Sequence, residues 1–199
     1  AEEHIGCDLH VVPCSGLTRN LTFADWGRLW VMPSLAMPRY ETALLYPGTC
    51  LFEGTNWSEG RGTADPFAII GASGVDADRL SDAFNGLKLA GVVSTPVYFV
   101  PSASKHKGET CGGVHLHITD EKALRPVELG YRLLDLARTL FPETFEILPP
   151  YSEGGKPFIS LLAGNRKLEC DSWSVEEMLQ RQEQDCAAFR EKTEKYRLY

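Results

Sequence analysis

The sequence predicts an α+β fold in which a mixed β-sheet is packed by helices within a single domain. Two segments, 91–101 and 112–119, have the composition of β-strands, and three, 76–86, 125–141 and 174–195, have apolar residues at helical spacing. The chain has 199 residues, of which 43% are hydrophobic, so it can bury one sizeable core. The last of the three helical segments is expected to be a long C-terminal helix.

The segment 112–119 gives the clearest strand signal. Its apolar residues alternate with His115 and His117, which is the period-two pattern of a strand with one buried face. The two histidines are therefore expected to share the other face. Two further segments are apolar enough to be ordered: 8–12 is expected to be a strand, and 43–52 a strand or a short helix.

The predicted helices carry start signals of their own. Asp76 is expected to cap the first, Pro126 stands in the first turn of the second, and Ser174 with Glu177 fits a capping box for the third. The side of the C-terminal helix that is expected to be buried consists of Val175, Met178, Leu179, Cys186 and Phe189.

Two stretches rich in proline and glycine interrupt this pattern. Residues 18–40 are expected to form a long ordered loop, and long loops in compact domains are often functional. Residues 149–157 are expected to be a surface turn within the domain.

Charge and composition exclude several kinds of partner. A net charge of -7 and a pI near 5.3 disfavour binding to a nucleic acid or to an anionic membrane surface. The apolar runs are shorter than the ~20 residues that a bilayer span needs. The six cysteines are widely spaced and form no CxxC pair, so buried thiols are expected more than a disulfide framework. The opening AEEHIG lacks the features of a signal peptide and suggests a cut within a longer protein.

The stretch LFEGTNWSEGRGTADPF, residues 51–67, is the candidate functional loop. Its glycines permit positive φ angles, and its side chains offer donors and acceptors of every kind. Glu53 and Glu59 supply the two carboxylates that glycoside hydrolysis requires. A structural alternative stays open, in which Glu59 and Arg61 form an ion pair that pins the loop and Glu53 caps a backbone amide.

Four other side chains have both a functional and a structural interpretation. Trp57 can stack on a sugar ring or fill the core. Lys105 can meet an anionic group or be solvated at the surface. His115 and His117 follow Cys111, but no further ligands complete four positions, so hydrogen-bonded histidines are expected and no metal site is predicted.

Motifs for other common chemistries are missing from the sequence. It contains no GxSxG, Walker, GxGxxG, HExxH or EF-hand pattern, and no cofactor is predicted. The residues by themselves therefore indicate a site for a polar ligand such as a carbohydrate.

The string YPGTCLFEGTNWSEGRGTADPF, together with CGGVHLHITD further along, closely resembles the C-terminal half of the NamZ family. These bacterial exo-β-N-acetylmuramidases were long described as a domain of unknown function. The resemblance covers nearly the whole chain, so residues 1–199 are expected to form one NamZ-like C-terminal domain. It also implies that a Rossmann-like N-terminal domain of the parent protein lies outside this chain and is its partner.

The resemblance implies a glycoside hydrolase that removes terminal N-acetylmuramic acid (MurNAc) from peptidoglycan fragments. A glutamate of the N-terminal domain is then the favoured acid, the cleft lies between the two domains, and this chain alone is expected to be inactive. Arg61 or Lys105 would pair with the lactyl carboxylate of MurNAc. The residues expected at the site are Glu53 and Glu59 as catalytic groups, and Asn56, Trp57, Ser58, Arg61, Thr63, Lys105 and His117 as substrate contacts.

Three positions depart from the family pattern. Ala36 stands where an asparagine is usual, Asp65 where an arginine is usual, and Gly74 where a tryptophan is usual. These changes leave two alternatives to the hydrolase open: a non-catalytic carbohydrate-binding module, and a structural domain that docks onto its partner. A peptidoglycan substrate implies the cell envelope or a secreted protein, whereas recycling of imported fragments implies the cytoplasm.

Overall fold

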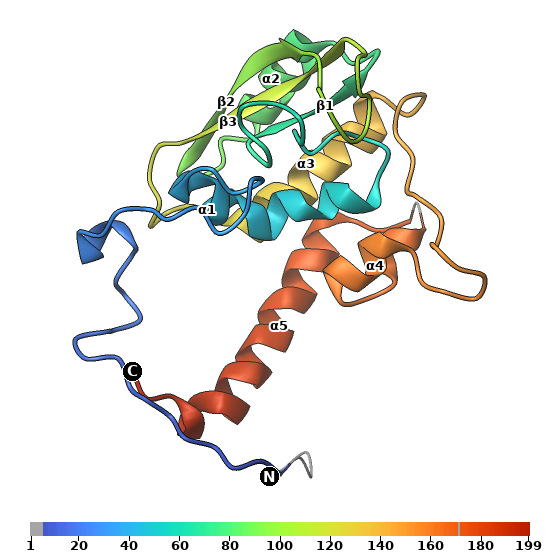
Figure 1. The fold of residues 1–199 in the computed structure, drawn as a ribbon. Helices are drawn as coiled ribbons and strands as arrows, with labels where there is room; N and C mark the ends of the chain where they lie inside the picture. Colours follow the sequence, from blue (N-terminus) through green and yellow to red (C-terminus); the bar gives the residue numbers. More distant parts are fainter. Residues whose placement is uncertain (1–5, 171) are drawn as a thin grey trace. The chain divides into compact units, whose positions relative to one another are not determined.

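The computed structural model describes residues 6–170 and 172–199, which fall into two compact units (Figure 1). The larger unit runs from Trp30 to Glu183 and contains the sheet. The smaller unit combines the residues before 30 with those from 184 onward. Because the candidate loop 51–67 lies wholly in the larger unit, the architecture of that unit decides which side chains can reach a ligand.

The larger unit is built on a three-stranded sheet with the order β1-β3-β2. Its strands are β1 (Ile69–Ser73), β2 (Val92–Phe99) and β3 (Cys111–Ile118). The central strand pairs antiparallel with both neighbours: Ile70 lies opposite Val114 in one ladder, and Thr95 opposite His115 in the other. The predicted α+β class and the strands predicted at 91–101 and 112–119 are confirmed.

The sheet is antiparallel throughout, where the sequence suggested mixed pairing. Strands β1 and β2 run parallel to each other, because both pair antiparallel to β3, and helix α2 (Ala77–Gly86) connects them. They are not neighbours, however, because β3 returns between them. A helical crossover alone therefore does not reveal which strands pair.

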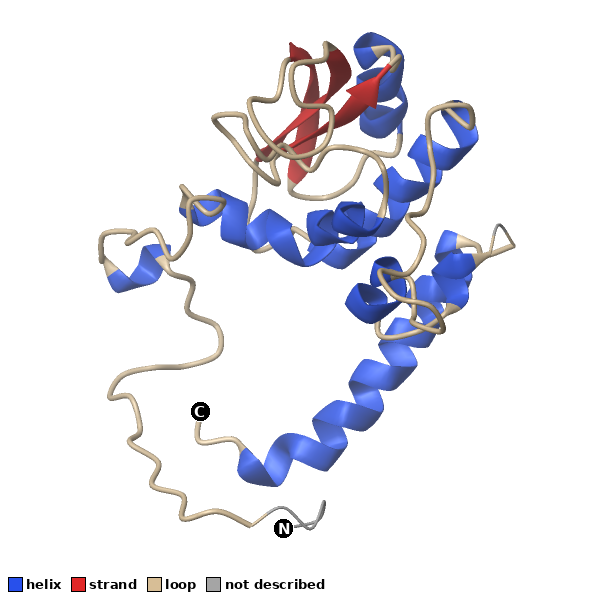
Figure 2. Ribbon diagram, turned by 45° about the vertical axis from the view of Figure 1, so that its right-hand side comes forward, coloured by secondary structure: helices blue, strands red, loops and turns tan. Residues whose placement is uncertain are grey.

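The two faces of the sheet have different coverings. Helix α2 packs on one face, and loops cover the other (Figures 1 and 2). Asp76 caps α2 as predicted, since its Oδ1 accepts the Arg79 N–H at 3.0 Å. His115 contacts Asp65 of the candidate loop, and the His117 ring packs beside His115, so both histidines lie on the loop-covered face. The alternation in the sequence of β3 therefore placed the histidines correctly.

The described residues form four further α-helices. They are α1 (Tyr40–Thr49), α3 (Pro126–Leu140), α4 (Phe158–Ala163) and α5 (Val175–Thr193). The predicted helices at 125–141 and 174–195 are confirmed, and the short helix that was one of two options for 43–52 is observed as α1. Strand β1 and helix α4 were not predicted. Both are very short, and β1 lacks alternation because its first four residues are all buried.

Helix α5 is less buried than predicted. Ser174 caps it by accepting the Glu177 N–H at 3.2 Å, and Val175 and Met178 are buried. Phe189, by contrast, is exposed. Phe189 belongs to the smaller unit, which has few buried side chains. It has the helical spacing of a buried residue, but that unit offers no core for it to pack against.

The chain before α1 is mostly irregular. The strand predicted at residues 8–12 is not formed: these residues are exposed and pair with no other strand among those described. The loop predicted for 18–40 is confirmed, apart from a 3-10 turn at Ala24–Trp26. The surface turn at 149–157 is also confirmed. Among the described residues, no helix combines the length and apolar character of a membrane span.

Glycine at position 130 is required where α1 and α3 cross. A Cβ at Gly130 would lie 2.4 Å from the Gly48 carbonyl oxygen, inside van der Waals contact. Gly130→Ala is therefore expected to lower the free energy of unfolding by about 2–3 kcal/mol. Gly86→Ala in α2 is the matched control, because nothing lies within 4 Å of its added Cβ and helix propensity favours alanine. Equal urea midpoints for the two variants would contradict this assignment.

The buried thiols predict a loss of stability at alkaline pH. Cys50 and Cys111 are buried free thiols, and burial raises the pKa of each from 9.0 to about 11. Between these values the unfolded chain loses thiol protons that the folded chain keeps, so the free energy of unfolding falls as pH rises through this window. A Cys50→Ala, Cys111→Ala variant is expected to show a shallower fall in urea titrations from pH 8 to 11. The exposed Cys170→Ala is the control, and identical slopes for all three proteins would refute the effect.

Candidate functional site

The candidate loop leaves α1 through the 3-10 turn η2 (Cys50–Gly54) and returns to the sheet at β1. Its middle is held at the sheet edge by two backbone hydrogen bonds. The Ser58 N–H donates to the Gly71 carbonyl at 2.8 Å, and the Gly71 N–H donates to the Ser58 carbonyl at 3.1 Å. The side chains that follow Ser58 are therefore placed by the sheet.

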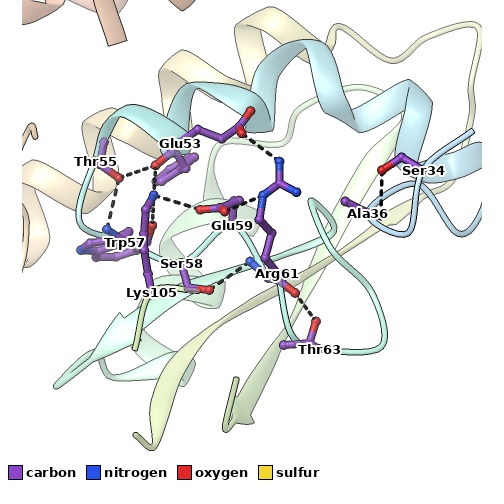
Figure 3. A network of polar contacts seen from close by, with 12 residues as sticks. Ser34, Ala36, Glu53, Thr55, Trp57, Ser58, Glu59, Arg61, Thr63 and Lys105 are labelled. Atoms are coloured by element: carbon purple, nitrogen blue, oxygen red, sulfur yellow. Dashed lines mark hydrogen bonds and ion pairs between the residues drawn. The ribbon is translucent and has the colours of Figure 1, made fainter. Parts of the chain in front are cut away.

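Glu59 is the buried centre of a network of four charges (Figure 3). Its side chain is 3% exposed, with Oε1 3.0 Å from Arg61 Nε and Oε2 2.9 Å from Lys105 Nζ. Glu53 joins the network through its Oε2, which lies 2.9 Å from Arg61 Nη2. Two carboxylates and two cations thus balance one another. A buried carboxylate is tolerated under these conditions because it is paired on both oxygens.

Lys105 is fully occupied by the protein. Its ammonium group donates to the carbonyls of Phe52 at 2.8 Å and Trp57 at 3.0 Å, and to Glu59 Oε2 at 2.9 Å. Burial lowers the pKa of Lys105, and the charge of Glu59 opposes that shift. An ammonium group has three N–H donors, and all three are used. Lys105 is therefore neither a solvated surface lysine nor available to the carboxylate of a ligand, which corrects both sequence interpretations.

Arg61 is the charged residue of this network that reaches furthest into solvent. Its side chain is 39% exposed, and its Cζ lies 5.0 Å from the centre of the Phe67 ring. None of the described residues bonds to Nη1, so donors remain for a ligand. Glu53 is partly exposed beside it, and Tyr46 lies against Glu53: burial first, then the Glu53 charge, raises the Tyr46 pKa.

Trp57 points into the core. It is 0% exposed, packs against other aromatic rings and donates its indole N–H to the Thr144 carbonyl at 3.0 Å. The rings around it are Phe52, Phe141 and Phe145. Trp57 therefore presents no face for a sugar to stack on, and the core interpretation is the correct one.

Ser58 and Asn56 also serve the fold. Ser58 is buried, and its hydroxyl accepts the Gly60 N–H at 3.1 Å. The Asn56 amide uses both ends: Nδ2 donates to the Thr144 carbonyl, and Oδ1 accepts the Glu146 N–H, each at 2.9 Å. Ser58 is therefore closed to a ligand, whereas Asn56 is partly exposed and keeps a second amide N–H, so its predicted contact with substrate remains a prediction.

Thr63 and His117 are partly exposed, and each has a partner within the chain. The Thr63 hydroxyl donates to the Gly60 carbonyl at 2.6 Å. His117 Nε2 lies 2.9 Å from the Thr95 hydroxyl, and burial lowers the His117 pKa. Both can still be approached from the surface, so their predicted contacts with substrate remain predictions.

The segment 101–110 packs against the candidate loop and is hydrogen-bonded to it. Besides Lys105, Ser102 bonds the Gly62 carbonyl through N–H and hydroxyl, and His106 Nε2 lies 3.1 Å from the Asn56 carbonyl. A Cβ at Gly62 would lie 2.4 Å from Ala103 N, so only glycine allows this approach. Ser104 and His106 have φ angles of 66° and 55°. Such strained backbone concentrates at functional sites.

Asp65 organises a second polar cluster on the same loop. Its Oδ2 is paired with Arg39 Nη2 and lies 2.7 Å from His115 Nε2, while the His115 and His117 ring centres are 4.4 Å apart. The Asp65 side chain is 10% exposed, and its Oδ1 is buried without a hydrogen-bond partner among the described residues. Arg39 and His115 were not predicted as site residues. The departure at Asp65 and the histidine alternation were the only signals for them.

The other two departures from the family pattern, Ala36 and Gly74, add no polar side chain to the loop. Ala36 donates its N–H to the Ser34 hydroxyl at 3.1 Å, and Gly74 is exposed with a φ of 82°. Two cavities of the larger unit, about 350 and 410 Å³ in volume, are lined by residues outside the loop. In the described part of the chain, no three His, Cys, Asp or Glu side chains are grouped to hold a metal ion.

The accessible polar side chains of the loop are therefore Glu53, Asn56, Arg61 and Thr63, and Asp65 links Arg39 and His115 to the loop. These groups can donate and accept hydrogen bonds to a polar ligand. Glu59 and Lys105 lie behind them and fix their positions.

Comparison with known proteins assigns the chain to a family. A model of the C-terminal region of exo-β-N-acetylmuramidase NamZ matches residues 44–199. The peptidoglycan β-N-acetylmuramidase NamZ of Bacillus subtilis (strain 168) is 37% identical over 202 residues, which covers 100% of this chain but 47% of that protein.

Two crystal structures of DUF1343 family proteins from Bacteroides fragilis NCTC 9343 have the same fold. They superpose with TM-scores of 0.83 and 0.64 at 27% and 26% identity, cover 97% of this chain, and are matched over 51% and 49% of their own length. The chain thus spans about half the length of these relatives. It belongs to the family of NamZ C-terminal domains.

Proposed function

We propose that this chain forms the substrate-facing wall of a glycoside hydrolase that releases terminal MurNAc from peptidoglycan fragments. The name and 37% identity of the Bacillus subtilis relative support the substrate class. The observation that carries the proposal is the half-exposed Arg61, which is fixed at the surface end of a buried charge network. A preorganised donor of this kind suits the hydroxyl and amide oxygens of a sugar.

The catalytic acid is proposed to come from the half of the parent protein that lies outside this chain. In this chain Glu53 and Glu59, the two predicted catalytic groups, are both engaged in ion pairs with Arg61, and Glu59 is sealed from solvent. Glu53 is the more accessible of the two predicted catalytic groups. We therefore assign Glu53 to contact with substrate and Glu59 to positioning.

Substitution of Arg61 tests the ligand-facing role. In the full-length parent protein, Arg61→Met is expected to lower kcat/KM on a chromogenic MurNAc glycoside by about tenfold or more, since a charge-assisted hydrogen bond is lost. Arg190→Met, an exposed arginine on α5, is the control and should leave the rate unchanged. Undiminished turnover by Arg61→Met would exclude the proposal. Sugar binding without any turnover by the unaltered protein would favour the carbohydrate-binding module instead.

Substitution of Glu59 separates positioning from catalysis. Glu59→Gln leaves the Lys105 ammonium buried without its counter-charge, so the free energy of unfolding is expected to fall by about 3–5 kcal/mol. Adding Lys105→Met removes that cation and should restore part of the loss, giving a non-additive double-mutant cycle in urea unfolding. A Glu59→Gln protein that keeps full stability but loses all turnover would instead make Glu59 catalytic.

A further inference from the structure

We propose that Arg39 and His115, both held by Asp65, form the site that recognises the acidic group of the ligand. The inference rests on the proposed function, in which that ligand is a sugar acid. It places the ligand carboxylate at the Asp65 cluster instead of at Arg61 or Lys105.

The cations of the first network are poorly suited to bind an anion. Lys105 has no N–H left, and Arg61 already has two carboxylates on its guanidinium, with Glu53 Oε2 at 2.9 Å and Glu59 Oε1 at 3.0 Å. A third carboxylate placed there would meet the repulsion of both. Arg61 can still donate to uncharged sugar oxygens.

Arg39 has a different electrostatic setting. Its side chain is 52% exposed and contacts a single carboxylate, that of Asp65. The same Asp65 oxygen is also 2.7 Å from His115 Nε2, so its charge is shared between two partners. None of the described residues bonds to Arg39 Nε or Nη1. Asp65 contacts Nη2, which has a second N–H, so that N–H and a free neighbouring nitrogen form an edge that can bind a carboxylate through two parallel hydrogen bonds.

His115 completes the site with an acceptor. Because the Asp65 carboxylate accepts from Nε2, the neutral ring carries its proton there and leaves a lone pair on Nδ1. The ring is partly exposed, and no described residue bonds to that nitrogen. A hydroxyl or amide N–H of the sugar is the matching donor. Arg39 and His115 together therefore favour a ligand in which a carboxylate lies beside a hydroxyl or an amide N–H.

Asp65 has the features of a residue that serves a binding site at a cost to the stability of the fold. Its Oδ1 is buried without a hydrogen bond from any described residue, which lowers stability. Buried unsatisfied groups of this kind are rare and call for a functional explanation. The other oxygen, Oδ2, contacts both Arg39 and His115, so the Asp65 carboxylate lies where it fixes the positions of those two side chains.

Two sugars that differ only in the lactyl group test the assignment. Isothermal titration of the chain with MurNAc and with N-acetylglucosamine is expected to show about a tenfold or greater preference for MurNAc. Arg39→Met should abolish the preference and leave the affinity for N-acetylglucosamine unchanged. Arg61→Met should weaken both sugars by the same factor. A preference that survives Arg39→Met but disappears in Arg61→Met would overturn the inference and leave the proposed function standing.

A second readout needs no sugar binding. D-Lactate, the acidic fragment alone, is expected to shift the NMR signals of the His115 ring in the unaltered chain and not in Arg39→Met, with urea midpoints confirming that both proteins are folded. If the isolated chain binds neither sugar, turnover by the full-length parent still decides the proposed function. The lactate titration decides the site: a shift that requires Arg39 supports it, and no shift refutes it.

Discussion

The buried ion pair between Glu59 and Lys105 is the interaction on which the rest of the site depends. Lys105 comes from the segment between β2 and β3, and Glu59 from the segment between η2 and β1, so the pair joins two loops that are 46 residues apart in the sequence. Removing two such charges from water costs several kcal/mol for each ion. That cost is offset only because every oxygen of Glu59 and every N–H of Lys105 has a partner.

This requirement explains the unusual backbone around the pair. The Lys105 ammonium must reach the carbonyls of Phe52 and Trp57, which brings its loop within contact distance of Gly62. Positive φ angles on both sides of Lys105, at Ser104 and His106, let the side chain turn inward. The glycines of the candidate loop are thus needed for close approach: Gly62 to the segment 101–110, Gly54 to Ile159 and Gly60 to the Ile69 carbonyl. They do not make the loop flexible, since hydrogen bonds hold it along its length.

The sequence predicted local structure well where one element carries its own signal. The cap at Asp76, the alternation of β3 and the spacing of α3 each depend on neighbouring residues, and all three were found. The outward or inward direction of the loop side chains depends on distant partners. Trp57 is buried because Phe141 and Phe145 surround it, and Asn56 is occupied because Glu146 lies beside it. Nothing near residues 56 and 57 in the sequence indicates those contacts.

The sequence likewise does not show which counter-charges surround each cation. Composition identified Arg61 and Lys105 as cations that could meet a sugar acid, but a cation attracts an anion only to the extent that its own counter-charges allow. Two carboxylates contact Arg61, whereas one contacts Arg39, and that one is shared with His115. In a low-dielectric setting each additional carboxylate reduces the attraction for a further anion by more than a surface pair would. The count of partners therefore separates two arginines that look equivalent in the sequence: one suits the uncharged ring oxygens of a sugar, and the other its acidic substituent.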